Sequence, residues 1–193
     1  MKLKFIELNE EHLEQVRAWR MLPEITKYMY TDPIITKESQ LKWFHSIRYD
    51  ESNRNWVVSV DGVLIGFVNL KISWKNKRGF WAYYIGNPDY IGKGIGVQIE
   101  LNILRYVFDI LNLNKLECEV FQFNNRVVRI HQKCGSKIEG TLRHHVIKNE
   151  GLENIICMGI LKSEWDLIKD DFDINIAEIE YDEPILAIDY ANY

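Results

Sequence analysis

The chain lacks the features that mark secreted, zinc-binding and membrane proteins. It has only three cysteines, Cys118, Cys134 and Cys157, without CxxC spacing, so neither a disulfide framework nor a zinc site is expected. No stretch approaches the ~18–20 apolar residues that a membrane span needs. The segment from Met1 to Phe5 runs directly into a strand pattern, so we expect no signal peptide and a cytoplasmic location.

Charge is unevenly distributed along the chain. From Ser163 onward the chain has ten acidic residues and one lysine, which leaves 18 acidic and 23 basic residues in the rest. No dense Lys/Arg stripe is present, so nucleic acid is not an expected partner. A mildly basic body instead suits a small anionic ligand.

The two common glycine-rich nucleotide motifs are missing. Gly92-Lys93-Gly94-Ile95-Gly96 has neither GxGxxG spacing nor a GK[ST] ending. These glycines follow a strand-like run, Phe80–Ile85, and precede apolar residues at helical spacing from Val97 to Leu111. Glycines at a helix start expose several backbone N–H groups to one ligand, so the turn is predicted to hold a phosphate or diphosphate.

The order of predicted elements indicates an α+β domain with a central mixed, mostly antiparallel sheet flanked by helices. A strand and two helices come first, followed by three antiparallel strands that include the Asp61-Gly62 hairpin turn. The long helix, another strand, a helix ending at Gly135 and two final strands complete the pattern. We expect one domain over residues 1–168 and an acidic extension over 169–193, whose end is an extra strand, an edge-pairing arm or a disordered tail.

These motifs resemble the GNAT N-acetyltransferase superfamily. Its glycine turn reads Arg/Gln-x-x-Gly-x-Gly/Ala, and here Ile91 stands at the leading position. A second family block appears as Asn124, Lys133 and Gly135, with Ser136 in place of the usual Phe. The resemblance implies acetyl-CoA as co-substrate, no metal, a possible homodimer, and a sheet that splays in the middle to admit the pantetheine arm.

A narrower resemblance is to the branch that acetylates UDP-4-amino-4,6-dideoxy-N-acetyl-altrosamine in pseudaminic acid biosynthesis. It is carried by Trp19-Arg20, the run from Pro23 to Thr31, Leu41-Lys42-Trp43-Phe44 and the run from Asn124 to His131. The expected acceptor is therefore the 4-amino group of a UDP-amino-sugar. The Gly140–Arg143 and Glu164-Trp165 segments also occur in relatives that acetylate ribosomal protein N-termini or polyamines, and a non-catalytic acetyl-CoA-binding module is a further alternative.

The resemblance assigns candidate cofactor residues to the strand before the turn, the turn itself and the second block. They are Tyr83, Tyr84, Ile85, Ile91, Gly92, Lys93, Gly94, Ile95, Gly96, Asn124 and Lys133.

Acetyl transfer to an amine requires a base for the amine and an acid for the departing thiolate. Glu119 is the expected base, and it shares a strand face with Glu117. His131 is the expected acid, because it stands where many relatives carry a tyrosine, seven residues after Asn124. The structural alternative for Glu119 is a solvated carboxylate on an exposed sheet face. The structural alternative for His131 is a packed helix histidine that makes one hydrogen bond.

Aromatic and polar side chains of the N-terminal helices and strand rims are expected to bind the acceptor. The candidates are Arg20, Tyr28, Tyr30, Trp43, Asn69 and Arg143. His144 and His145 are adjacent on a strand and should point to opposite faces, which argues against a two-histidine metal site.

Overall fold

The structure is a computed structural model, and it describes residues 1–181. A single eight-stranded sheet has the order β6-β7-β5-β4-β3-β2-β1-β8. The strands are β1 (Leu3–Glu7), β2 (Asn53–Val60), β3 (Val63–Ser73), β4 (Arg78–Ile85), β5 (Lys115–Phe121), β6 (Lys137–Lys148), β7 (Gly151–Leu161) and β8 (Glu178–Ile179). Only β4–β5 and β1–β8 pair in parallel, so the sheet is mixed and mostly antiparallel, as predicted.

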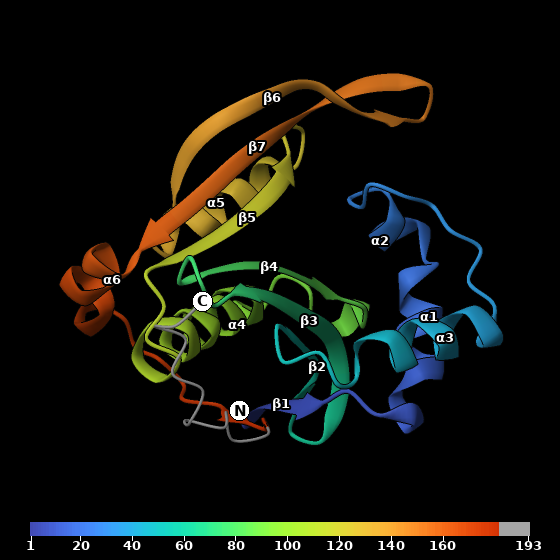
Figure 1. Cartoon of the computed structure of the whole chain (residues 1–193), viewed down its shortest axis with the longest axis horizontal. Helices are drawn as coiled ribbons and strands as arrows, with labels where there is room; N and C mark the ends of the chain where they lie inside the picture. Colours follow the sequence, from blue (N-terminus) through green and yellow to red (C-terminus); the bar gives the residue numbers. More distant parts are fainter. Residues whose placement is uncertain (182–193) are drawn as a thin grey trace.

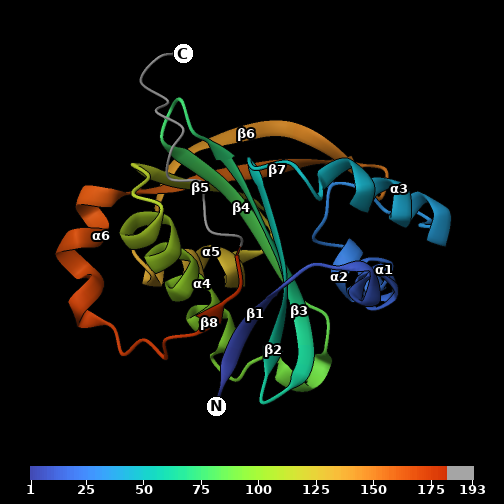
Figure 2. The same cartoon turned by 60° about the horizontal axis from the view of Figure 1, so that its bottom comes forward.

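Helices cover both faces of this sheet (Figure 2). The N-terminal helices on one side are α1 (Leu13–Arg20), α2 (Pro23–Thr26) and α3 (Lys37–Ile47). The other side carries α4 (Ile95–Arg105), α5 (Asn125–Lys133) and α6 (Lys162–Ile168). Within residues 1–181 no helix is both long and apolar enough to cross a lipid bilayer.

Short helical segments complete the described chain. They are η1 (Glu10–His12), η2 (Pro88–Tyr90), the π-helical η3 (Tyr106–Ile110) and η4 (Lys169–Asp171). The sequence indicated one helix through Leu111, but α4 gives way to a π-helical turn at Tyr106.

Local sequence signals account for most element boundaries. Asn9 accepts a hydrogen bond from the backbone of Glu11, and Thr36 forms a capping box with Ser39 at the start of α3. The hairpin turn between β6 and β7 places both Asn149 and Glu150 at positive φ. Two consecutive positive φ values match the twist of a tight hairpin.

Apolar side chains form two clusters on opposite faces of the sheet. The larger lies under α4, where Ile99, Leu104 and Tyr106 are fully buried. The smaller lies under α1 and α3 and includes Trp19 and Phe44. Trp43, next to Phe44, is 36% exposed, because adjacent helical residues point to different faces.

The segment after α6 returns across the molecule and packs against its body. Residues Glu178–Ile179 form β8 and pair with β1 at the sheet edge. The indole Nε1 of Trp56 donates to the carbonyl of Glu180 at 2.6 Å. Of the three alternatives for the extension, the described part is an extra, edge-pairing strand, whereas residues 182–193 lie outside the described residues. The boundary at residue 168 stays a prediction.

Candidate active site

The sheet opens into a wedge between β4 and β5. These strands pair only at Arg78–Lys115, Gly79–Leu116 and Phe80–Glu117. Beyond this point β4 stays paired with β3 as far as Ile85, and β5 stays paired with β7 as far as Phe121. The facing edges of the two strands therefore have no ladder partner in the wedge, as the resemblance predicted (Figure 1).

The glycine turn lies at the open end of β4 and leads into α4. Gly92 and Gly94 have φ values of 88° and 78°, and α4 begins directly after Gly94. No acidic residue occurs in its first turn, so the positive end of the helix dipole is not neutralised there. A Cβ at Gly94 would meet no atom within 4 Å, which leaves open space beside the unpaired N–H groups. This arrangement fits a diphosphate.

The expected cofactor residues of β4 do not share one face. The ring of Tyr83 stacks on Trp81 at 5.2 Å, and a Cβ at Gly96 would come within 2.9 Å of its hydroxyl. Tyr84 points to the other face, where it packs on Phe67 at 5.7 Å. The side chain of Tyr83 thus lies beside the turn, whereas Tyr84 can offer the wedge only its backbone.

The remaining residues expected at the cofactor differ in position and exposure. Ile91 is 46% exposed, whereas Ile95 is buried and can contribute only its backbone N–H. Asn124 is the N-cap of α5, and its side chain makes no capping hydrogen bond. Lys133 is exposed at the other end of this nine-residue helix, about 13 Å away along its axis.

His131 lies beneath the wedge and is buried, with 3% of its surface exposed. Its ring makes an edge contact with Trp81 of β4 at 5.6 Å. Nδ1 lies 2.9 Å from Oε1 of Glu100, a buried residue of α4. Burial lowers the pKa of His131, but the carboxylate of Glu100, helped by the thiol of Cys118, outweighs burial and raises this pKa to about 10. His131 is therefore held as an imidazolium.

Glu119 lies on the opposite face, where it meets the N-terminal segment. The hydroxyl of Tyr30 donates to Oε2 of Glu119 at 2.5 Å. Burial, followed by this carboxylate, raises the pKa of Tyr30, so Tyr30 remains a neutral donor. The ring of Tyr30 also contacts Phe121 at 5.6 Å and His145 at 6.4 Å. Glu119 is therefore exposed but lies beside aromatic rings, whereas its neighbour Glu117 is paired with Arg78 and Lys115.

A buried lysine ties the β6–β7 hairpin to the loop that carries Tyr30. Nζ of Lys148 donates to both carboxylate oxygens of Asp32 at 2.5 Å and to the carbonyl of Thr26 at 2.9 Å. The side chain of Lys148 is 3% exposed. Because all three hydrogen bonds of this amine go to the loop that carries Tyr30, Lys148 holds that loop beside Glu119.

The other residues expected at the acceptor are only partly brought together. Arg20 donates from Nη2 to Thr31, while its buried Nη1 has no partner among residues 1–181. Tyr28 packs on Phe123 at 6.1 Å. Trp43 packs on Phe67 at 6.3 Å, and Asn69 donates to the side-chain oxygens of Asn53 and Asn55.

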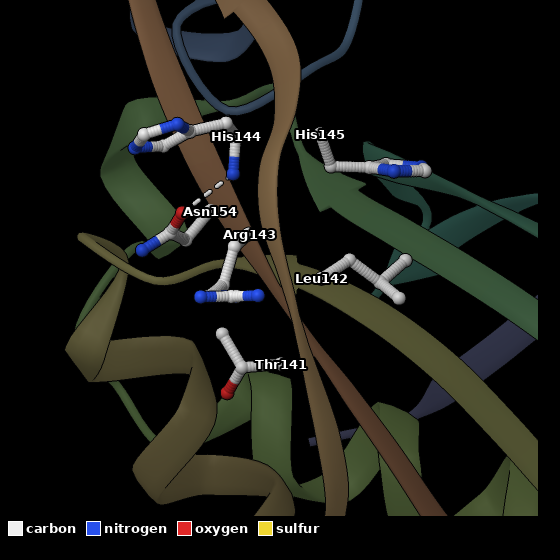
Figure 3. A pocket seen from close by; sticks show the side chains of 6 residues that line it. All are labelled: Thr141, Leu142, Arg143, His144, His145 and Asn154. Atoms are coloured by element: carbon white, nitrogen blue, oxygen red, sulfur yellow. Dashed lines mark hydrogen bonds between the residues drawn. The ribbon is translucent and has the colours of Figure 1, made fainter.

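A bulge in β6 decides which of its residues faces Tyr30. Pairing with β7 is interrupted between Leu142 and Val146, and His144 has a positive φ of 51°. Arg143, His144, His145 and Asn154 all line a hollow of about 630 Å³, and the side chain of His145 points away from those of Arg143 and His144 (Figure 3). The structure thus brings His145, rather than Arg143, into ring contact with Tyr30. Within residues 1–181, no group of three or more His, Cys, Asp and Glu side chains is arranged to hold a metal.

Two residues of the site were absent from the expected set, although the sequence carries a signal for each. Phe121 follows Glu119 by two positions, so strand alternation puts both on one face. Glu100 falls on the apolar stripe of the long helix, where a carboxylate is unusual.

Comparisons with known proteins agree with this geometry. The acetyltransferase (GNAT) domain family matches residues 2–137. The chain is 28% identical over 164 residues to spermidine N(1)-acetyltransferase of Escherichia coli (strain K12), covering 84% of this chain and 88% of that protein. It is 29% identical over 134 residues to acetyltransferase PseH of Campylobacter jejuni, covering 69% and 82%.

A solved structure of spermidine N-acetyltransferase from Vibrio cholerae in complex with CoA and spermine is also similar. Its TM-score is 0.81 at 25% identity, and the match covers 85% of this chain and 98% of that one. Polyamine acetyltransferases thus match at least as well as the amino-sugar branch, so the narrower resemblance is not confirmed. The chain belongs to the GNAT acetyltransferase family and is an acetyl-CoA-dependent N-acetyltransferase.

Proposed function

We propose that this enzyme acetylates a primary amine of a small polycationic acceptor of the polyamine type. The observation that carries this proposal is the carboxylate of Glu119, which faces Tyr30 and Phe121 and is not paired with any cation of residues 1–181. A carboxylate flanked by aromatic rings suits an alkylammonium group. The similarity to spermidine acetyltransferases from two organisms supports the same acceptor class.

In this proposal Glu119 binds the ammonium group and accepts its proton, which leaves a neutral amine. The hydroxyl of Tyr30 keeps its proton and orients the carboxylate. Acetyl-CoA supplies the activated thioester, with its diphosphate at residues 92–96 and its arm in the wedge. His131, beneath the wedge and already protonated, is the proposed donor to the leaving sulfur. Free backbone N–H groups of β4 are the proposed donors to the acetyl carbonyl.

A UDP-4-amino-sugar is the second candidate acceptor, and one observation favours it. Nη1 of Arg20 is buried near the Tyr30 loop, and none of the residues that the structure describes forms a hydrogen bond with it. A guanidinium with a free donor suits a phosphate of a nucleotide-sugar. The similarity to PseH supports the same alternative. By contrast, the other nearby cation, Lys148, is already saturated by Asp32 and Thr26.

A coupled thiol-release assay over spermidine, spermine, an amino-sugar nucleotide and a ribosomal N-terminal peptide tests the proposal. We expect kcat/KM for the polyamines to exceed the others by at least tenfold. Preference for the amino-sugar nucleotide would reverse the order of the two candidates, and preference for the peptide would overturn both.

Glu119 and Glu117 provide a matched pair of variants for the proposed base. Glu119→Gln should lower kcat by ~10²-fold, the scale of lost base catalysis, with CoA affinity retained. Glu117→Gln lies on the same face but is paired with Arg78 and Lys115, so its kcat should stay close to wild type. Equal losses in both variants would point to a general charge effect of this strand.

A further inference from the structure

Arg126 lies at the start of α5, opposite the glycine turn. A Cβ placed on Gly92 would be 3.7 Å from Nη2 of Arg126. The two residues are 34 positions apart in the sequence, and only the packing of α5 beside α4 brings them together. The guanidinium therefore lies against the loop at the point where backbone N–H groups are exposed.

The guanidinium of Arg126 has no competing partner. Among the residues that the structure describes, none forms a hydrogen bond or ion pair with it, and the side chain is exposed. Its charge also acts on Tyr83, where it opposes the burial that raises the pKa of that phenol. The hydroxyl of Tyr83 in turn adjoins Gly96 at the other end of the turn.

The turn itself carries no side chain that could form a fork of hydrogen bonds to phosphate. Ile91, at the leading position of the motif, is apolar and 46% exposed. Lys93 is the only cation within residues 91–96, and its ammonium lies 5.5 Å from the ring centroid of Tyr90. A guanidinium binds phosphate oxygens through two parallel hydrogen bonds, which a single ammonium cannot do.

We propose that Arg126 supplies, from α5, the diphosphate-binding side chain that Ile91 does not provide. This inference rests on the proposed placement of acetyl-CoA at the turn. It assigns a binding role to a residue on a different element from the glycine motif.

Isothermal titration of the full-length protein with CoA, 3′-dephospho-CoA and pantetheine tests this role. Arg126→Gln should weaken CoA and 3′-dephospho-CoA binding equally, by about tenfold or more, the scale of a lost charge-assisted hydrogen bond. Pantetheine, which lacks the diphosphate, should bind equally to both proteins. Arg129→Gln, three residues along the same helix and also exposed, should stay within about twofold of wild type.

A second substitution, made together with Arg126→Gln, gives the most discriminating test of this role. Ile91→Arg places a guanidinium at the motif position, so the double variant Ile91→Arg/Arg126→Gln should recover most of the lost CoA affinity. Unchanged CoA affinity in Arg126→Gln would overturn the inference. A loss confined to CoA and absent with 3′-dephospho-CoA would also overturn it, because Arg126 would then bind the 3′-phosphate.

Gly94→Glu separates this inference from the proposed function. A carboxylate there projects into the open space beside the turn and should abolish CoA binding, whereas Gly94→Ala carries the same φ strain without the charge. If Gly94→Glu weakens binding but Arg126→Gln does not, only the role of Arg126 is wrong. If neither changes CoA affinity, the placement of acetyl-CoA itself is wrong.

Discussion

Oε1 of Glu100 lies 2.9 Å from Nδ1 of His131, and neither residue is more than 3% exposed. The pair joins α4 to α5 directly below the splayed strands. The second carboxylate oxygen of Glu100 has no hydrogen-bond partner within the described part of the chain. An ion pair in such a position stabilises the fold only while both members are charged.

The first prediction concerns the pH dependence of stability. The pKa of His131 is about 10 in the folded protein and ordinarily 6.5, so the folded state binds the proton more tightly. The stabilisation from the pair is then complete below about pH 6.5 and is lost as the pH rises towards 10. Glu100→Gln should lower the free energy of unfolding at pH 6.5 by about 3–5 kcal/mol, and this difference should shrink towards pH 10. Denaturant titrations from pH 6 to 10 measure it.

The difference in the free energy of unfolding between wild type and Glu100→Gln is free of contributions from groups that titrate equally in both proteins. Cys134 also faces Glu100, and its pKa is raised by burial, so its neutral thiol adds little in this range. Glu117→Gln, at a partly exposed ion pair, should cost only about 0–1 kcal/mol. A difference between wild type and Glu100→Gln that does not vary with pH would mean that the pair is not ionised.

The second prediction concerns the pH dependence of kcat and the role of His131 as the acid. With Glu100→Gln, burial is left to lower the pKa of His131, so the protonated fraction falls at neutral pH. The descending limb of kcat should therefore move to lower pH by at least one unit, while CoA affinity stays unchanged. His131→Gln, which cannot ionise, should lower kcat by ~10²-fold and abolish that limb. A wild-type profile in Glu100→Gln would exclude the pair from the chemistry.

The third prediction concerns the link between Lys148 and Asp32. Asp32→Asn leaves a buried ammonium without its counter-ion, so the loop that carries Tyr30 should loosen. KM for the acceptor should rise about tenfold, with little change in CoA affinity. In Lys148→Met no charge is left buried, so this variant should be better folded than Asp32→Asn and yet show a similar rise in KM. An acceptor KM equal to wild type in both variants would show that the tether does not shape the acceptor site.

The fourth prediction concerns the C-terminal segment. The carboxamide of Asn102 is fully buried; it donates to the carbonyl of Asn175 at 3.0 Å and accepts from the N–H of Ala177 at 2.8 Å. Truncation after Asp171 removes both partners, exposes the β1 edge, and should lower the free energy of unfolding by about 3 kcal/mol or more. Truncation after Tyr181 keeps every described contact and is the matched control. Equal melting temperatures for wild type and both truncations would contradict this account.

Much of the architecture is local and could be predicted from the sequence. The Asp61-Gly62 turn, the caps at Asn9 and Thr36, and the glycine turn before the long helix each depend on neighbouring residues. The same is true of the shared face of Glu117 and Glu119, which follows from strand alternation. The splay between β4 and β5 was predicted from the family resemblance, because the periodicity of the sequence alone does not indicate it.

The residues that meet at the site were harder to predict, because they lie on different elements. Tyr30 and Glu119 are 89 positions apart, and Glu100 and His131 are 31 apart. In β6, which has a bulge, His145 rather than Arg143 contacts the ring of Tyr30, and no local pattern fixes a bulge in advance.

The sequence by itself determined the periodicities, turns and caps, and hence the family and its mixed sheet, because these depend on backbone geometry over a few residues. Only the tertiary structure decided that His131 is charged, that Arg126 reaches the glycine turn, and that the acidic extension closes the edge of β1. Protonation state and ligand contacts depend on charges and burial contributed by residues far away in the chain, and these distances exist only once the helices have packed on the sheet.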